Sequence, residues 1–135
     1  MLIGFSDRPN LITGFTAKFE NLQDRLLFVK SGGRTALLDA IYLGLSEMKK
    51  ATTNRRALLV ISDGGDNHSR YTEGDIKRAV KESDVQIYSV GIFEPLSSRA
   101  RTPEEAGGPS LLADVAEVSG GRMFSGEDTN ELPDI

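Results

Sequence analysis

The strongest hydrophobic pattern in the sequence is an unbroken apolar run at residues 57–61, which is followed at once by polar residues and two glycines. A short apolar run without polar alternation is typical of a strand that is buried on both faces of a helix-covered parallel sheet. Because the glycines end the strand, polar side chains gather at its carboxyl end, where open α/β sheets place their ligands. We therefore predict a buried strand at 56–62 and a functional loop after it, with Asp63 as the first candidate residue.

Before this strand, the pattern predicts a hairpin and two helices. Short apolar runs at 1–5 and 11–15 flank a turn rich in Asp, Pro and Asn, as in a β-hairpin. Thr16 is the expected N-cap of a helix whose apolar residues recur at helical spacing up to Val29, and residues 30–34 break this helix. Thr35 begins the next helix, which is apolar around much of its circumference as far as Met48. That helix should therefore be well buried.

After the strand, helices and strands alternate. Thr72 is the expected N-cap of a helix, and residues 85–93 form a second buried strand. Residues 94–108 are rich in Pro, Ser, Glu and Gly, so they predict a long surface loop. Ser110 is the expected cap of a helix that ends at Gly120, and 122–125 form a short last strand. Residues from 132 onward resemble the start of another helix.

These elements predict one α/β domain over residues 1–135. Strand, helix and strand at this spacing form a βαβ unit, so the strands at 56–62 and 85–93 should be parallel. The expected architecture is a three-layer, doubly wound, Rossmann-like domain with a mostly parallel sheet and one antiparallel edge hairpin.

Composition narrows the function classes. The 135 residues are 39% hydrophobic and 27% charged, as in a soluble globular domain. The net charge of -4 and the absence of a Lys/Arg-rich run argue against a nucleic-acid binder. Without cysteine the chain has no disulfide and no thiolate zinc site. No apolar run is long enough to span a membrane, and the N-terminus lacks the basic region of a signal peptide, so the compartment stays open.

Two loops carry the candidate site residues. One loop, at 31–35, opens a buried helix with Thr35, and the other, at 62–67, closes the central strand with Asp63. In a parallel sheet both should lie at the carboxyl edge, where hydroxyl and carboxylate oxygens suit a hard cation such as Mg²⁺, Mn²⁺ or Ca²⁺. A structural role competes in each case, because Thr35 can be a simple N-cap and Asp63 a turn residue. Asp66 and Asn67 are expected to shape the loop, and His68 to be solvated.

Five segments in this order resemble the von Willebrand factor A (VWA) domain family. The segment Gly-Gly-Arg-Thr-Ala-Leu-Leu-Asp-Ala at 32–40 is similar to a family motif, and 59–67 resembles the fourth strand with its following loop. Residues 3–7, 85–92 and 119–124 resemble the second, fifth and last strands. The insert after residue 93 and the Gly-Gly-Arg ending look most like bacterial members, including a subfamily abundant in soil acidobacteria. Such members are often exported.

The resemblance implies a non-enzymatic module that binds a protein partner through a metal-ion-dependent adhesion site. In the family this site combines an Asp-x-Ser-x-Ser motif from the first strand with a Thr and an Asp from two later loops. Here the later contributions fall on Thr35 and Asp63, with Gly32, Gly33, Gly64 and Gly65 shaping the loops. The cofactor of an intact domain would be Mg²⁺ or Mn²⁺.

The chain departs from this pattern because it matches the family only from the second strand onward, and no Asp-x-Ser-x-Ser motif occurs in it. We therefore expect an N-terminally truncated domain with an incomplete site and no tightly bound metal. The vacant central position should lie between the strands at 1–5 and 57–62. Three outcomes are open there: the two strands close up, two chains associate across the gap as a dimer, or an upstream segment fills it. We favour the dimer.

Two other functions stay open at the level of the sequence. One is a metal-assisted hydrolase that uses Asp63, Asp66 and His68. The other is a structural scaffold without any site. No phosphate loop, dinucleotide fingerprint, nucleophile elbow or EF-hand pattern is present to support a further class.

Overall fold

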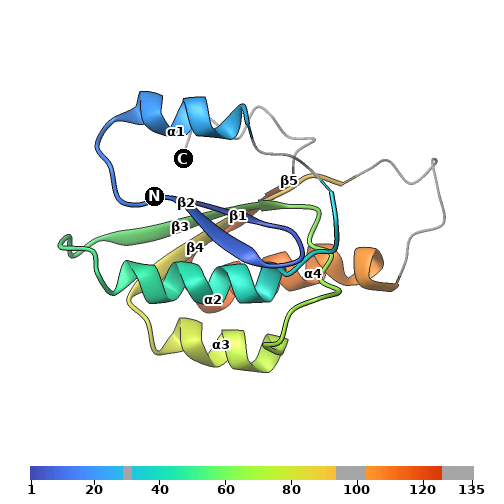
Figure 1. The fold of residues 1–135 in the computed structure, drawn as a ribbon. Helices are drawn as coiled ribbons and strands as arrows, with labels where there is room; N and C mark the ends of the chain where they lie inside the picture. Colours follow the sequence, from blue (N-terminus) through green and yellow to red (C-terminus); the bar gives the residue numbers. More distant parts are fainter. Residues whose placement is uncertain (29–31, 94–102, 126–135) are drawn as a thin grey trace.

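The computed structural model describes residues 1–28, 32–93 and 103–125. These residues form two sheets and the helices around them (Figure 1). The strands are β1 (Leu2–Phe5), β2 (Pro9–Thr13), β3 (Arg56–Ser62), β4 (Val85–Gly91) and β5 (Met123–Ser125). The helices are α1 (Phe19–Leu26), α2 (Leu37–Met48), α3 (Glu73–Lys81) and α4 (Pro103–Val118).

The larger sheet is parallel and has the order β3-β4-β5. Strand β4 pairs with β3 along its whole length, from Arg56 opposite Val85 to Ser62 opposite Gly91. The chain returns from β3 to β4 through α3, so the predicted βαβ unit is confirmed. The predicted last strand is also confirmed as β5, with Phe124 opposite Val90.

The smaller sheet is the predicted hairpin. Strands β1 and β2 pair antiparallel, with Gly4 opposite Asn10 and Phe5 opposite Pro9. Pro9 fits there because β2 lies at an edge, where a residue without an N–H group is tolerated. The hairpin does not join the parallel sheet, so β1 does not close up against β3. The α/β architecture, with a parallel sheet and an antiparallel hairpin, is otherwise as predicted.

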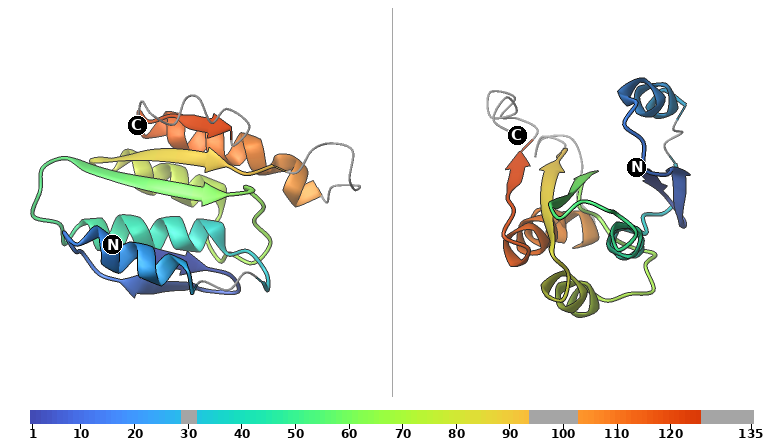
Figure 2. Two further views of the ribbon diagram at one scale, coloured as in Figure 1. Left: turned by 90° about the horizontal axis from the view of Figure 1, so that it is seen from above. Right: turned by 90° about the vertical axis from the view of Figure 1, so that its left-hand side faces the viewer.

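Helices α2, α3 and α4 lie on one face of the parallel sheet (Figure 2, right). Their apolar faces form the core with Val60, Val85 and Ile87 of the strands. Helix α2 comes especially close to β3, because a Cβ atom on Gly44 would lie 3.0 Å from the Leu58 side chain. The core therefore fixes the amino end of α2 at the carboxyl edge of the sheet.

The opposite face of β3 is open, which corrects the prediction of a strand buried on both faces. Side chains alternate across a strand, and those that point away from α2 are exposed: Leu59 and Ile61 each retain 53% of their accessible surface. Helix α1 is the helix on this side (Figure 2, right), and it buries none of its own residues. The apolar run predicted burial correctly for only one face, because no described helix packs over the other.

Other boundaries also differ from the sequence prediction. Helix α4 begins at Pro103, so 103–108 are helical rather than part of a loop and Ser110 is not a cap. Pro is favourable in a first helical turn. Gly108 lies so close to the loop after β3 that a residue with a Cβ atom would not fit there. Helix α1 begins after Lys18 rather than Thr16. Val29, the loop from 94 to 102 and the expected helix from 132 lie outside the described residues.

Two predicted helix ends are confirmed. The Thr72 hydroxyl accepts a hydrogen bond from the Asp75 backbone N–H, while the Asp75 carboxylate accepts one from the Thr72 backbone, which completes a capping box. Helix α4 ends where Gly120 adopts a φ of 79° and Gly121 donates to the Ala116 carbonyl.

Candidate functional site at the carboxyl edge

The loop after β3 is held by short-range hydrogen bonds to two side chains. Asp63 Oδ1 accepts from the Gly65 backbone N–H at 3.1 Å, and Ser62 Oγ accepts from the Gly64 N–H at 3.0 Å. Gly64 has a φ of 80°, a region that glycine enters without strain. A Cβ atom on Gly64 would lie 2.3 Å from the Gly108 carbonyl oxygen, so α4 packs directly against the loop. The Asp63 carboxylate itself is exposed to solvent.

The loop before α2 is tied to the end of β1. Gly32 and Gly33 have positive φ angles, of 144° and 90°, which turn the chain into the helix. The Arg34 backbone N–H then donates to Asp7 Oδ1 at 2.7 Å, and the Ala36 N–H donates to the Ser6 carbonyl at 2.9 Å. These bonds connect the hairpin to the amino end of α2.

Backbone hydrogen bonds at Thr35 join the two loops. The Thr35 N–H donates to Asn67 Oδ1 at 2.9 Å, and the Thr35 carbonyl accepts from the N–H groups of Asn67 and His68 at 3.0 and 3.1 Å. The main chain of Thr35 is therefore fixed, while its hydroxyl makes no hydrogen bond to another described residue. The loops carrying Thr35 and Asp63 lie at one edge of the sheet, as their positions in the sequence suggested.

Thr35 is not the N-cap of α2, which corrects one structural interpretation of the sequence. Ala36 occupies the cap position, and its own side chain offers no acceptor. The free N–H groups of the first turn bond instead to the loop after β3: Leu37 donates to Asp66 Oδ1 at 2.9 Å, and Asp39 donates to Ser69 Oγ at 3.0 Å. A carboxylate at this position also interacts favourably with the helix dipole.

Asp39 is a structural residue that sequence reasoning did not single out. The residue is only 6% exposed, and its carboxylate accepts the N–H groups of Arg70 and Tyr71 at 2.8 and 3.1 Å. Nearby, the Tyr42 and Tyr71 rings stack with their centroids 4.0 Å apart, and their hydrogen bond raises the pKa of Tyr71. A single acidic residue in an otherwise apolar helix face was the signal that could have identified Asp39.

The hydrolase hypothesis required Asp63, Asp66 and His68 to converge, and the described residues do not support this arrangement. Asp66 Oδ1 is engaged by Leu37 N–H and by Ser69 Oγ. His68 Nδ1 lies 3.1 Å from Arg34 Nη1, and a cation beside the ring disfavours binding of a second cation. Within the described parts of the chain, no three His, Asp or Glu side chains are placed to share a metal ion.

The oxygen donors at this edge are also too few to complete a metal-ion-dependent adhesion site. Thr35 and Asp63 offer one hydroxyl and one exposed carboxylate, whereas Ca²⁺ takes six to eight oxygen ligands and Mg²⁺ demands near-ideal octahedral geometry. Oδ1 of Asp7 and Oδ1 of Asp66 already accept backbone N–H groups. Among the residues that the structure describes at this edge, these donors do not by themselves make up a full coordination shell.

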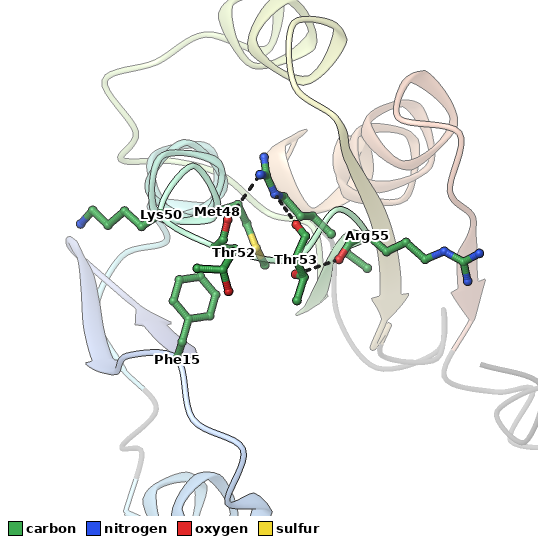
Figure 3. Close-up of a pocket in the computed structure, with 9 residues that line it drawn as sticks. Phe15, Met48, Lys50, Thr52, Thr53 and Arg55 are labelled. Carbon is green, nitrogen blue, oxygen red and sulfur yellow. Dashed lines mark hydrogen bonds between the residues drawn. The ribbon is translucent and has the colours of Figure 1, made fainter.

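A pocket of about 420 Å³ at the other end of β3 does not offer comparable chemistry (Figure 3). The Arg56 guanidinium is held by the Thr53 and Ala51 carbonyls at 3.1 and 3.4 Å. Lys50 and Arg55 point away from the pocket to opposite sides (Figure 3). The polar groups here stabilise the loop between α2 and β3, so the carboxyl edge is the better candidate site.

Comparison with known proteins identifies the fold. No family model matches the sequence. The chain is similar in structure to an aerotolerance-related membrane protein from Bacteroides fragilis, with a TM-score of 0.70, 18% identity and coverage of 98% of this chain and 73% of that one. A von Willebrand factor type A protein from Catenulispora acidiphila gives a TM-score of 0.67 with 16% identity, over 98% of this chain and 30% of that one. The chain has the von Willebrand factor A fold.

Two further matches carry no functional description. BatB from Bacteroides thetaiotaomicron, a conserved hypothetical protein, superposes with a TM-score of 0.69 and 16% identity, over 98% of this chain and 72% of that one. An uncharacterized protein from Borreliella burgdorferi is 23% identical over 94% of this chain, which spans only 41% of that protein. None of the described helices is both long and apolar enough to cross a membrane.

Proposed function

We propose that this VWA-like chain is a non-enzymatic protein-binding module whose binding edge is formed by the loops at Thr35 and Asp63. One observation carries this proposal: Thr35 and Asp63 lie in loops that interlock through backbone bonds, yet the Thr35 hydroxyl has no hydrogen-bond partner among the described residues and the Asp63 carboxylate is exposed. Such an edge is rigid and presents hard oxygen donors. A partner that supplied further oxygens could complete a divalent-metal site there.

The proposal predicts weak binding of metal by the chain alone. Two side-chain donors leave most of the coordination shell to water, so Mg²⁺ and Mn²⁺ should bind no tighter than Ca²⁺ binds to weak extracellular modules, with dissociation constants of ~10⁻⁴–10⁻³ M. Isothermal titration of each ion into the wild type should give a small heat that disappears in Asp63→Ala. The matched control is Asp84→Ala, which removes an exposed Asp at the amino end of β4 and should keep the wild-type heat.

The two competing functions predict different experimental results. A site-less scaffold predicts identical null traces for the wild type and both variants. A hydrolase predicts metal-dependent turnover of a phosphate or ester substrate that Asp63→Ala abolishes. Binding of metal without turnover is the result that supports the binding module.

A further inference from the structure

Two tyrosine rings lie face to face beside the start of α3. Tyr42 belongs to α2 and Tyr71 directly precedes the N-cap of α3, so the pair joins two helices that lie side by side (Figure 1). The ring centroids are 4.0 Å apart, and the ring planes are inclined by only 21°. A hydrogen bond connects the two phenol groups and raises the pKa of Tyr71. The rings are therefore stacked with their hydroxyl ends together.

The buried carboxylate of Asp39 holds this stack in place. Asp39 and Tyr42 are three residues apart, so they lie on the same side of α2. The Asp39 carboxylate accepts the backbone N–H groups of Arg70 and Tyr71 at 2.8 and 3.1 Å. The main chain of Tyr71 is thereby fixed one helical turn from Tyr42. The stack is a consequence of the way α2 and the loop before α3 are joined.

The stack brings together the ring atoms that couple when tyrosine is oxidised. Loss of one electron and the hydroxyl proton converts a phenol into a phenoxyl radical, whose unpaired electron is shared by the oxygen and the ring carbons ortho and para to it. Two such radicals combine through their ortho carbons to give dityrosine. Because the rings of Tyr42 and Tyr71 are nearly parallel and their hydroxyls are joined, the ortho carbons of one ring face those of the other.

The composition of the chain directs oxidation to this pair. The side chains of Cys, Trp and Tyr lose one electron most readily, and the sequence contains no Cys, no Trp and three Tyr. The third tyrosine, Tyr88, lies on β4 between Ile87 and Ser89, which are fully buried. Side chains alternate across a strand, so Tyr88 points to the face of the sheet opposite to α2, α3 and α4 (Figure 2, right). Within one chain, the sheet therefore separates Tyr88 from the stacked pair.

We propose that Tyr42 and Tyr71 form an oxidative cross-linking site, at which a one-electron oxidant such as a peroxidase with hydrogen peroxide joins them as dityrosine. Each phenol gives up one electron and its hydroxyl proton. A carbon–carbon bond then forms between two ortho carbons, and the hydrogen on each of these carbons moves to the phenol oxygen. The two electrons and two protons that are released convert one hydrogen peroxide into two water molecules. Tyr42 retains 39% of its accessible surface, which leaves it accessible and free to turn as the bond forms.

The cross-link fastens α2 to the segment between the carboxyl edge and α3. This segment includes Asp66 and Ser69, which accept the N–H groups of the first turn of α2. Like a disulfide, a covalent link between residues 42 and 71 restricts the unfolded chain, so it should stabilise the domain. The inference goes beyond the proposed function, because it involves neither Thr35, nor Asp63, nor a metal ion.

Peroxidase and hydrogen peroxide test the proposal on the full chain, at a protein concentration low enough to disfavour coupling between molecules. The monomer should acquire the blue fluorescence of dityrosine and lose the mass of two hydrogen atoms. Peptide mapping should show the peptides of Tyr42 and Tyr71 joined, and the midpoint of thermal unfolding should rise. Oxidation of methionine adds oxygen and increases the mass, so it is distinguished from coupling.

Conservative variants locate the cross-link. Tyr42→Phe and Tyr71→Phe each remove one phenol but keep an aromatic ring in the stack, so both should lose the fluorescence of the monomer almost completely. Because Tyr42 is an exposed residue, its Phe variant should keep the fold, which circular dichroism checks. Tyr88→Phe, on the other face of the sheet, is the matched control and should cross-link as the wild type does. Asp63→Ala should also cross-link, so failure of this inference is distinguishable from failure of the metal site.

Several results would overturn the inference. They are fluorescence that appears only in covalent dimers, monomer fluorescence that survives in Tyr42→Phe, and monomer fluorescence that is lost in Tyr88→Phe. A monomer in which oxygen is added to the tyrosines without coupling would also overturn it.

Discussion

At the scale of single residues, the carboxylates that accept hydrogen bonds between α2 and the loop after β3 differ in exposure from Asp63. Asp39 and Asp66 accept backbone N–H groups across the gap between α2 and the loop after β3, whereas Asp63 bonds only within its own turn and faces solvent. A buried acceptor that satisfies N–H groups is costly to remove, because its donors lose their partner. An exposed acceptor is not costly to remove. Stability measurements should therefore separate the two kinds of Asp.

The first residue-scale prediction concerns Asp39. Asp39→Ala leaves the N–H groups of Arg70 and Tyr71 without their acceptor, so the free energy of unfolding should fall by about 2–3 kcal/mol. Urea unfolding measures this change. Asp24→Ala, at an exposed position of α1, is the control and should stay within about 0.5 kcal/mol of wild type. An equal loss in both variants would contradict the structural role of Asp39.

The second prediction compares two glycines. Gly64→Ala adds a Cβ atom that would meet the Gly108 carbonyl, at a φ that Ala rarely adopts, so it should destabilise the chain by at least about 1 kcal/mol. Gly107→Ala lies in α4 with open space around the new atom, and helix propensity should make it neutral or stabilising by up to about 1 kcal/mol. Thermal unfolding of both variants checks the pair. A harmless Gly64→Ala would mean that the loop does not pack against α4 in solution.

At the scale of elements, local signals predicted α3 and the parallel strands well. The Thr72 cap, the apolar run of β3 and the two glycines after α4 act within a few residues, so they can be read from the sequence. The start of α2 could not be read in this way, because its capping groups come from the loop after β3. The first turns of α4 also make a contact with a residue distant in the sequence, between Gly108 and Gly64.

Helix α3 supplies a pH-dependent prediction. Hydrogen bonds from the Thr72 hydroxyl and backbone hold the pKa of Asp75 below its ordinary value of 3.8. Since the ionised form is favoured in the folded state, its stabilisation is present above pH 3.8 and is lost as the pH falls through the lower, folded value. Asp75→Asn should therefore destabilise the chain at neutral pH and flatten the acid limb of its stability profile.

Chemical denaturation between about pH 2 and 7 measures this profile. Thr72→Ala removes the other half of the capping box and should cost about 1 kcal/mol at neutral pH. Asp84→Asn, at an exposed position outside any cap, is the control and should keep the wild-type acid limb. An Asp75→Asn profile parallel to that of the wild type would contradict the capping box.

At the scale of the whole molecule, the VWA-like fold was predictable and the arrangement of its sheets was not. The order of the motifs predicted the parallel sheet and its hairpin. Whether β1 would close up against β3 depended on packing against α2, which holds both strands but leaves a groove between them. The open face of β3 could not be predicted either, because local hydrophobicity does not reveal which neighbour covers a strand.

Paramagnetic broadening by Mn²⁺ can locate the proposed binding edge, where the loops of Thr35 and Asp63 meet. In a ¹⁵N-labelled sample, substoichiometric Mn²⁺ should broaden the amides of Thr35, Gly64 and Gly65 before any others, and Asp63→Ala should remove this selectivity. Broadening centred on another acidic surface, or the same pattern in Asp63→Ala, would contradict a binding edge at these loops.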